Sequence, residues 1–276
     1  MYKLIAIDLD GTLLNDDKKI PLENIIMVEN LIEKGYEVVI ATGRRYWSAK
    51  DLVKVINNDM TILANNGNIV RNSENDEVLN AKYIDLEDFR IIMKEGKKRN
   101  LYPIIHVDAY EEGYDILIEL ENENKNYFNF LKGEKRLKQI NNYMEIIDHN
   151  ILAVVYAGFK SELNSFHLDI NKKYPNIYNT HVMENITVSE ALLEIMNPFG
   201  TKWHSLSEYA MSKGIKTEEI ITIGDDNNDI GMIENAGLGI AMKNASLSVK
   251  SVSDIITKKD NNESGVAFEL KRVLNV

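Results

Sequence analysis

The first apolar run of the chain, residues 4–7 (LIAI), stops at two carboxylates and continues as residues 8–12 (DLDGT). A short apolar run that ends in acidic residues, a glycine and a hydroxyl predicts a buried parallel strand whose carboxyl end holds a reaction centre. Side chains alternate along a strand, so Asp8 and Asp10 are predicted to point to the same side. Two carboxylates at this spacing repel each other and favour a divalent cation bound by oxygen, with Mg²⁺ as the leading candidate. The alternative is a strand that ends in a solvated acidic turn.

Two further apolar runs end in the same way. Residues 36–41 lead into residues 42–44 (TGR), and residues 220–223 lead into residues 224–229 (GDDNND). Between these runs, Lys202 opens an amphipathic segment with helical spacing of its apolar residues. An acid pair, a hydroxyl, a lysine and a second acid cluster therefore follow one another along the chain, each at the boundary of a predicted element. This ordered set indicates phosphoryl transfer.

With these motifs the chain resembles the haloacid dehalogenase-like hydrolases, and in particular their Cof-type branch. The resemblance covers nearly the whole length, including residues 241–245 (AMKNA) and 264–267 (SGVA). The family's transport ATPases have threonine where this chain has Asp10. The resemblance therefore implies a phosphatase or a phosphomutase.

The resemblance implies a catalytic role for each residue that matches a family motif. Asp8 matches the nucleophile, whose carboxylate attacks phosphorus and forms an aspartyl phosphate. Asp10 matches the general acid and base, which protonates the leaving alcohol and then takes a proton from water. Thr42 matches the hydroxyl that binds a phosphoryl oxygen. Lys202 matches the ammonium that neutralises the nucleophile and the transferred group.

Phosphate and metal ligands follow from the same resemblance. Backbone amides near the glycines can form a nest for the phosphate, and polar side chains add further donors. The residues expected to bind the phosphate or the rest of the substrate are Leu9, Gly11, Thr12, Gly43, Arg44, Asn66 and Asn228. Mg²⁺ is expected on the Asp8 carboxylate, the Asp10 backbone carbonyl and Asp225. Asp229 is expected to orient these ligands or Lys202 from outside the coordination sphere of the metal.

Three positions depart from the family pattern or leave an alternative open. Trp203 follows the lysine where Cof-type chains often have glycine, which concerns the backbone path at that point. Residues 65–68 read NNGN where the family usually has Asn-Gly-Ala. Asn66 fits a contact near the phosphate, and a plain type I′ turn explains the Asn-Gly pair equally well. Asp226 is either a working member of the acid cluster or a solvated acid.

The order of predicted elements indicates an α/β fold with two domains. Strand, helix and strand alternate through residue 63, with Pro21 at the start of a helix and Gly35 at its end, as in a doubly wound parallel sheet. Residues 1–80 and 197–276 are predicted to form a Rossmann-like catalytic core. The pattern changes after about residue 80, and residues 81–196 are predicted to form an inserted α/β domain. Its place between the threonine and lysine motifs resembles the C2-type cap of the Cof branch.

Within the predicted cap, the pattern of apolar residues places helices and short strands. Helices are expected at residues 85–99 and 161–173. Strands are expected at residues 101–107, 114–120, 151–157, 186–189 and 192–196. The asparagine-rich stretch 121–129 is expected at the surface.

Composition narrows the range of partners. A formal net charge of −11 and a pI near 5.1 argue against general nucleic-acid binding, which needs a basic surface, but are compatible with a small phosphomonoester. The chain has no cysteine, which excludes a disulfide, a zinc–thiolate site and a thiol nucleophile. No signal-peptide pattern precedes the first strand, and the apolar stretch 151–159 is shorter than the roughly 20 residues that span a membrane. We therefore expect a cytoplasmic protein without a membrane partner.

Taken together, these features predict a Mg²⁺-dependent phosphatase that acts on a small phosphorylated metabolite. The core would perform the chemistry and the cap would select the leaving group. Three alternatives are a phosphomutase, a signalling receiver domain and a catalytically silent metabolite-binding protein. A receiver needs neither the second acid of the first motif nor so long an insertion, and the silent protein needs a reason why the filled catalytic positions lost their function. The sequence specifies neither the metabolite nor an oligomeric state.

Overall fold

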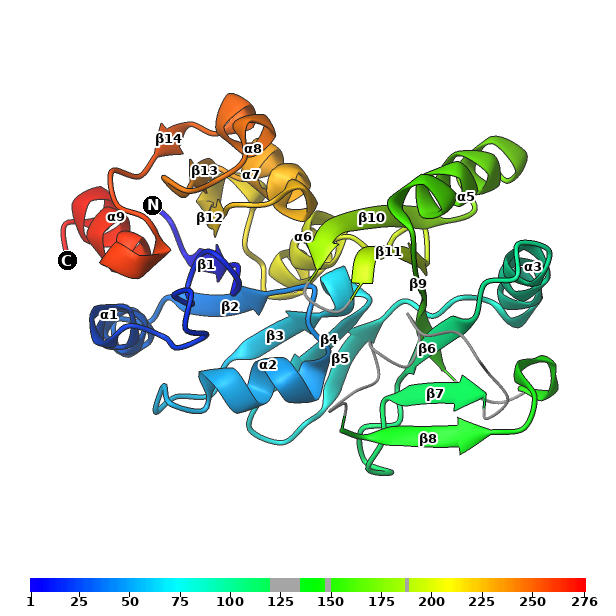
Figure 1. The fold of residues 1–276 in the computed structure, drawn as a ribbon. Helices are drawn as coiled ribbons and strands as arrows, with labels where there is room; N and C mark the ends of the chain where they lie inside the picture. The colour runs from blue at the N-terminus through cyan, green and yellow to red at the C-terminus, as the bar shows by residue number, and fades with distance from the viewer. Residues whose placement is uncertain (120–134, 147–149, 187–188) are drawn as a thin grey trace. The chain divides into compact units, whose positions relative to one another are not determined.

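The chain folds into two units, each with its own β-sheet (Figure 1). The computed structural model describes residues 1–119, 135–146, 150–186 and 189–276. The first unit contains Met1–Ala81 and Thr201–Val276, and the second contains Lys82–Gly200. The second unit is thus an insertion into the first. Its role as a cap that selects the substrate stays a prediction.

The sheet of the first unit is mostly parallel, as the sequence predicts. In spatial order its strands are β14 (Ile255–Ile256), β13 (Leu238–Ala241), β12 (Ile220–Gly224), β1 (Leu4–Ile7), β2 (Glu37–Ala41), β3 (Thr61–Ala64), β4 (Ile69–Asn72) and β5 (Val78–Ala81). The strands from β14 to β3 pair in parallel, and β4 and β5 add an antiparallel edge. The central strand β1 lies between β2 and β12, so the strand order reverses there. Open α/β sheets bind ligands at the carboxyl ends of the strands beside such a reversal.

The register of these strands brings the sequence motifs to one edge of the sheet. Every residue of β1 is buried, which suits a strand covered on both faces. Ile7, the last residue of β1, pairs with Ile40 on one side and Ile223 on the other. The segments that follow β1, β2 and β12 therefore leave the sheet at the same edge.

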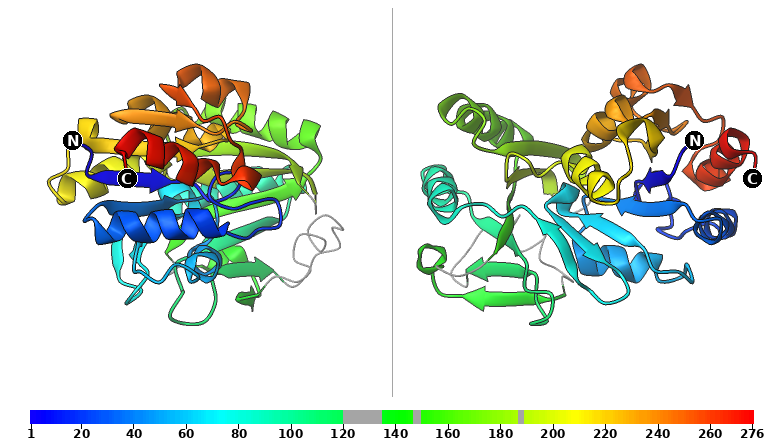
Figure 2. Two further views of the ribbon diagram at one scale, coloured as in Figure 1. Left: turned by 90° about the vertical axis from the view of Figure 1, so that its left-hand side faces the viewer. Right: turned by 180° about the vertical axis from the view of Figure 1, so that it is seen from behind.

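Helices cover both faces of this sheet. The α-helices of the first unit are α1 (Leu22–Glu33), α2 (Tyr46–Val53), α6 (Lys202–Ser212), α7 (Ile230–Asn235), α8 (Leu247–Val252) and α9 (Gly265–Leu274). Its short 3₁₀ turns are η1 (Asn65–Gly67), η3 (Thr217–Glu219), η4 (Asn227–Asp229) and η5 (Asn261–Glu263). Helices α1 and α9 lie side by side on one face, and α6 and α7 lie on the other (Figures 1 and 2). As predicted, α1 begins after Pro21 and ends before Gly35, whose φ of +86° suits a residue without a side chain.

In the described part of the second unit, six strands form one sheet with helices on one face. In spatial order its strands are β10 (Asn179–Ile186), β11 (Ser189–Met196), β9 (Ile151–Gly158), β6 (Pro103–Val107), β7 (Ile116–Glu119) and β8 (Leu137–Ile140). All neighbours pair antiparallel except β7 and β8. Helices α3 (Leu86–Lys97) and α5 (Lys160–Lys173) pack on the sheet through apolar residues such as Phe89 and Phe166, and η2 covers Tyr143–Glu145.

One predicted strand of the second unit is wrong. The sequence places a strand at 186–189, whereas the structure has two longer strands, β10 and β11, with Ile186 opposite Ser189. The error arises because β10 (NTHVMENI) mixes polar and apolar residues and shows no apolar run. Strand β8 (LKQI) was missed for the same reason. The predicted surface stretch 121–129 and the end of the strand predicted at 114–120 lie outside the described residues.

Within the ranges that the structure describes, no helix combines the length and the hydrophobicity needed to cross a membrane.

Candidate active site

Three strand ends and the start of one helix bring the predicted catalytic residues together. Asp8 follows β1, and its backbone N–H donates to the carbonyl of Ile223 in β12 at 3.0 Å. Thr42 follows β2 and is 1% exposed. Lys202 is the first residue of α6, which Thr201 caps by accepting a hydrogen bond from the His204 amide at 3.1 Å.

Lys202 joins two of the predicted acids in the interior of the first unit. Its Nζ lies 2.7 Å from Oδ1 of Asp8 and 2.7 Å from Oδ1 of Asp229. All three side chains are almost completely buried. Burial alone would lower the pKa of Lys202, but the charges of Asp229 and Asp8 outweigh it and raise that pKa. The lysine therefore stays a cation, and it binds Asp8 and Asp229 at the same time.

Asp225 is positioned by the loop that carries the first motif. The hydroxyl of Thr12 donates to Oδ1 of Asp225 at 2.7 Å. Gly11 lies against the same carboxylate, because a Cβ at this position would be only 2.3 Å from Oδ2 of Asp225. Gly11 also has a φ of +76°, which favours glycine. Both the space and the backbone conformation thus require the glycine of the motif.

Asp229 is fully engaged by donors of its own unit. Its Oδ2 accepts the backbone N–H groups of Asp225 at 2.9 Å and Asp226 at 3.1 Å, while Oδ1 accepts Lys202. The exposed Asp226 accepts the Asn227 amide at 2.8 Å and caps η4. This arrangement suits an Asp229 that orients the loop and the lysine. It also gives the solvated Asp226 a local structural function.

The acidic residues of the site fit a divalent cation. Carboxylate oxygens of Asp8, Asp225 and Asp229 lie within 4.8 Å of one another. Burial raises the pKa of Asp8 well above its usual range, although Lys202 opposes this, and burial also raises the pKa of Asp225 to about 7 despite the hydrogen bond from Thr12. Lys202 alone therefore does not offset the cost of ionising both Asp8 and Asp225 at this site, and a further cation would favour their ionised forms. Hard oxygen ligands in such a cluster suit Mg²⁺.

Asp10 points its carboxylate to two cations. Arg44 donates through Nε to Oδ2 at 2.6 Å and through Nη2 to Oδ1 at 2.8 Å, and Lys18 donates to Oδ1 at 2.8 Å. Burial would raise the pKa of Asp10, but these hydrogen bonds and charges lower it to about 2. Asp10 is thus held as an anion in this structure. Arg44, predicted to face the phosphate, is engaged with the predicted acid.

The remaining predicted residues line the same edge of the sheet. The Thr42 hydroxyl accepts the Arg44 amide at 3.1 Å, and Asn66 N–H donates to the Thr42 carbonyl at 3.0 Å. Asn66 Oδ1 accepts Asn228 Nδ2 at 2.9 Å, and a Cβ on Gly43 would lie 3.2 Å from the same oxygen. Asn66 has a φ of +57°, a left-handed conformation that is found in turns. Its side chain also lies at the site, so the two interpretations of the Asn-Gly pair are compatible.

Leu9 is completely buried, and its carbonyl accepts the amides of Thr12 at 3.3 Å and Leu14 at 2.8 Å. The backbone of the first motif is therefore a hydrogen-bonded turn. Trp203, which replaces the usual glycine, does not prevent Lys202 from reaching both acids.

Two residues at this site were not singled out from the sequence. Lys18 binds Asp10, and Asn244 donates through Nδ2 to the Gly11 carbonyl at 2.8 Å. Asn244 also accepts the Asn261 amide at 3.2 Å. Asn244 belongs to the stretch AMKNA, which is part of the family resemblance, so this stretch indicated a functional residue. No feature of the sequence near Lys18 distinguishes it from the other charged residues around it.

Comparison with known proteins identifies the family of this chain. The family model of haloacid dehalogenase-like hydrolases matches residues 5–270. The chain is a haloacid dehalogenase-like hydrolase. It belongs to the Cof type of this family, as its motifs predict, and it is a phosphatase.

Curated relatives match this hydrolase over almost its whole length. It is 30% identical over 288 residues to the 5-amino-6-(5-phospho-D-ribitylamino)uracil phosphatase YwtE of Bacillus subtilis, covering 99% of this chain and 98% of the relative. It is 27% identical over 295 residues to the phosphatase YwpJ of the same organism, covering 99% and 100%.

Solved structures support the fold. A haloacid dehalogenase-like hydrolase from Bacteroides thetaiotaomicron superposes on this hydrolase with a TM-score of 0.79 and 27% identity, covering 99% of this chain and 100% of the other. A crystal structure from Thermotoga maritima gives a TM-score of 0.81 and 29% identity, covering 99% and 97%. The α/β fold with a parallel-rich core and a second sheet domain is thereby confirmed.

Proposed function

We propose that this hydrolase is a Mg²⁺-dependent phosphomonoesterase that cleaves small phosphorylated metabolites through an aspartyl phosphate on Asp8. The observation that carries this proposal is the buried Lys202 between Asp8 and Asp229, with Asp225 close to both acids. A buried carboxylate beside a fixed cation, at the carboxyl end of the central strand, is a suitable nucleophile for an anionic phosphate.

In the first step, a carboxylate oxygen of Asp8 attacks phosphorus while the bond to the leaving oxygen breaks. Lys202 neutralises charge on Asp8 and on the transferred group. Thr42 uses a lone pair for the Arg44 amide, so its hydroxyl proton is available for a phosphoryl oxygen. Asp10 donates a proton to the leaving alcohol.

In the second step, Asp10 takes a proton from water as the water attacks the phosphorus of the aspartyl phosphate. Inorganic phosphate leaves and Asp8 is restored. Asp10 must be released from Arg44 or Lys18 to move a proton, because its pKa is held at about 2 while both bind it. An incoming phosphate dianion competes with Asp10 for one of the two donors of the Arg44 guanidinium, while the other donor keeps the Asp10 carboxyl oriented.

The residues that would hold Mg²⁺ are Asp8, Asp225 and the backbone carbonyl of Asp10. Bound there, the metal supplies positive charge that offsets the negative charge of the phosphoryl oxygens in the transition state. Asp229 already accepts three donors, which suits an orienting role rather than direct coordination.

For the substrate, we propose a small metabolite with a terminal phosphomonoester, selected by the unit Lys82–Gly200. The relative YwtE is named for a ribitylamino-uracil phosphate, so that compound belongs in the test panel beside sugar phosphates and pyridoxal phosphate.

The test is phosphate release from p-nitrophenyl phosphate and from the metabolite panel, with Mg²⁺ and with a chelator. Release that requires Mg²⁺ and falls by several orders of magnitude in Asp8→Asn supports the proposal. Asp226→Asn is the matched control, because this exposed acid of the same cluster should leave turnover nearly unchanged. Turnover that is independent of metal or insensitive to Asp8→Asn contradicts the proposal. Interconversion of sugar phosphates faster than phosphate release would instead identify a phosphomutase.

A further inference from the structure

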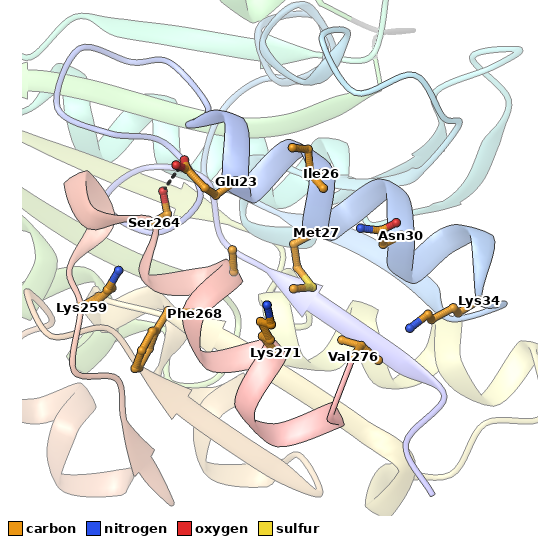
Figure 3. Close-up of a pocket in the computed structure, with 11 residues that line it drawn as sticks. Glu23, Ile26, Met27, Asn30, Lys34, Lys259, Ser264, Phe268, Lys271 and Val276 are labelled. Carbon is orange, nitrogen blue, oxygen red and sulfur yellow. Dashed lines mark hydrogen bonds between the residues drawn. The ribbon is translucent and has the colours of Figure 1, made fainter.

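A groove between helices α1 and α9 lies apart from the residues of the candidate active site. It encloses about 470 Å³, within the range of roughly 300–1,000 Å³ that small-molecule sites occupy. Figure 3 shows its lining side chains, which come from α1 and Lys34 just after it, from the segment before α9, and from α9 and Val276 just after it. None of them takes part in the proposed mechanism.

The groove is cationic in a chain that is strongly acidic. The chain has 43 acidic and 32 basic side chains, yet the side chains that line the groove include three lysines, Lys34, Lys259 and Lys271, and one carboxylate, that of Glu23; Val276, the last residue of the sequence, also lines it. Glu23 lies at one end, where it accepts the Ser264 hydroxyl at 3.0 Å (Figure 3). Within the described ranges, neither Lys34 nor Lys271 pairs with a carboxylate.

The surface between these lysines is apolar. Ile26 is 48% exposed although it is a large hydrophobic residue, and Met27 and Phe268 contribute further apolar surface to the groove. The Lys259 ammonium lies 5.3 Å from the centre of the Phe268 ring, so a cation and an aromatic face are held together. This combination suits a ligand with an apolar or aromatic body and an anionic group.

The groove is preformed rather than dependent on a ligand. Asn24 of α1 is completely buried, donates to the Leu13 carbonyl at 3.2 Å and accepts the Ala267 amide of α9 at 3.0 Å. This side chain fixes the two helices to each other. A rigid site binds with a smaller loss of conformational entropy.

We propose that the α1–α9 groove binds a small amphipathic anion, an aromatic or acyl compound with one carboxylate, sulfonate or phosphate group. The lysines bind the anionic group, and Ile26, Met27 and Phe268 contact the apolar body. This site is independent of the proposed catalytic function.

The experiment measures binding of two fluorescent probes to the full chain. The first is 8-anilinonaphthalene-1-sulfonate, and the second is N-phenyl-1-naphthylamine, which has the same aromatic body without the sulfonate. We expect saturable binding of the sulfonate at one site and binding of the neutral probe that is weaker by about tenfold or more, since the neutral probe lacks the charged group that the lysines would bind.

The variant Lys34→Gln/Lys271→Gln should weaken binding of the sulfonate by about tenfold or more, because two of the three lysine charges of the groove are lost. The matched control is Lys213→Gln. Lys213 is also exposed and lies 5.5 Å from an aromatic ring, that of Tyr209, but it lies outside the groove. Its replacement should leave binding unchanged, and circular dichroism confirms that each variant is folded.

Three results would overturn the proposal. The first is equal affinity of the sulfonate and the neutral probe, and the second is unchanged sulfonate affinity in the double variant. The third is displacement of the sulfonate by inorganic phosphate at the concentration that inhibits turnover, because this would place the probe in the active site.

Discussion

Arg44 and Asp10 form a two-point ion pair, with distances of 2.6 Å from Nε to Oδ2 and 2.8 Å from Nη2 to Oδ1. Two parallel bonds from a planar guanidinium fix the orientation of the carboxylate as well as its charge. Asp10 follows β1 and Arg44 follows the neighbouring strand β2, so the parallel sheet sets their separation. The proposed acid is thus oriented by a residue that can also bind phosphate.

This pair predicts a selective defect in Arg44→Lys. Lysine keeps the charge but loses the fork that orients Asp10. A poor alcohol leaving group needs the proton from Asp10, whereas p-nitrophenolate needs little protonation. We expect kcat/KM for an alkyl phosphate to fall about tenfold more than kcat/KM for p-nitrophenyl phosphate.

Arg45→Lys is the control for this experiment, because the Arg45 guanidinium lies 5.8 Å from the centre of the Trp47 ring instead of binding Asp10. It should leave the ratio of the two kcat/KM values unchanged. Equal losses for both substrates in Arg44→Lys would assign Arg44 to phosphate binding alone.

Replacement of Asp225 should weaken the response to Mg²⁺. Asp225→Asn removes a charged oxygen ligand but keeps the size of the side chain and an acceptor for Thr12. The Mg²⁺ concentration for half-maximal activity should rise by about tenfold or more. Titration of activity with Mg²⁺ measures this, with Asp226→Asn as the control. An unchanged Mg²⁺ dependence would remove Asp225 from the metal site.

Lys202→Met should destabilise the fold as well as abolish turnover. The substitution leaves Asp8 and Asp229 buried without their cation, and loss of one partner of a buried ion pair costs about 3–5 kcal/mol. Urea unfolding measures the change, and adding Asp229→Asn should restore part of the stability. If Lys202→Met lowers the free energy of unfolding by less than about 1 kcal/mol, the lysine contributes little to the stability of the fold.

Glu95 in the second unit predicts a pH dependence of stability. Hydrogen bonds from Lys173 and Lys98, with a smaller one from Arg99, lower the pKa of Glu95 to about 2 from its usual 4.5. Because the folded pKa is the lower one, this contribution is complete above pH 4.5 and disappears as the pH falls toward 2. Glu95→Gln should therefore lower the free energy of unfolding by about 1 kcal/mol at pH 7.

The difference between Glu95→Gln and the parent protein should shrink as the pH falls below 4.5. Urea unfolding between pH 7 and pH 3 measures it. Glu111→Gln is the control, because this exposed glutamate should give a small difference at every pH. If the difference in the free energy of unfolding between Glu95→Gln and the parent protein does not change with pH, the lowered pKa of Glu95 is contradicted.

The core of this fold could be predicted from the sequence because its strands are short apolar runs buried on both faces. Strands β1, β2 and β12 each end at a motif, and parallel pairing brings such ends to one edge. Strand β10 could not be found in this way, since its sequence mixes polar and apolar residues without an apolar run or a regular alternation.

For the site, the residue types were visible but their pairing was not. Lys202 and Asp8 are 194 positions apart, so no local pattern joins them, and their roles came from the family resemblance. Lys18 was also missed. It is close to Asp10 in the sequence, but no pattern indicates their contact, and the folded loop places the Lys18 ammonium 2.8 Å from Oδ1 of Asp10.

The central claim is that Asp8 becomes phosphorylated during turnover. Rapid quenching of the enzyme with substrate and Mg²⁺, followed by borohydride reduction, converts an aspartyl phosphate to homoserine, and peptide mass spectrometry then locates it. We predict homoserine at position 8 only when substrate is present, and its absence in Asp8→Asn. An unmodified Asp8 in enzyme that accumulates homoserine at another aspartate, such as Asp225, would contradict the account.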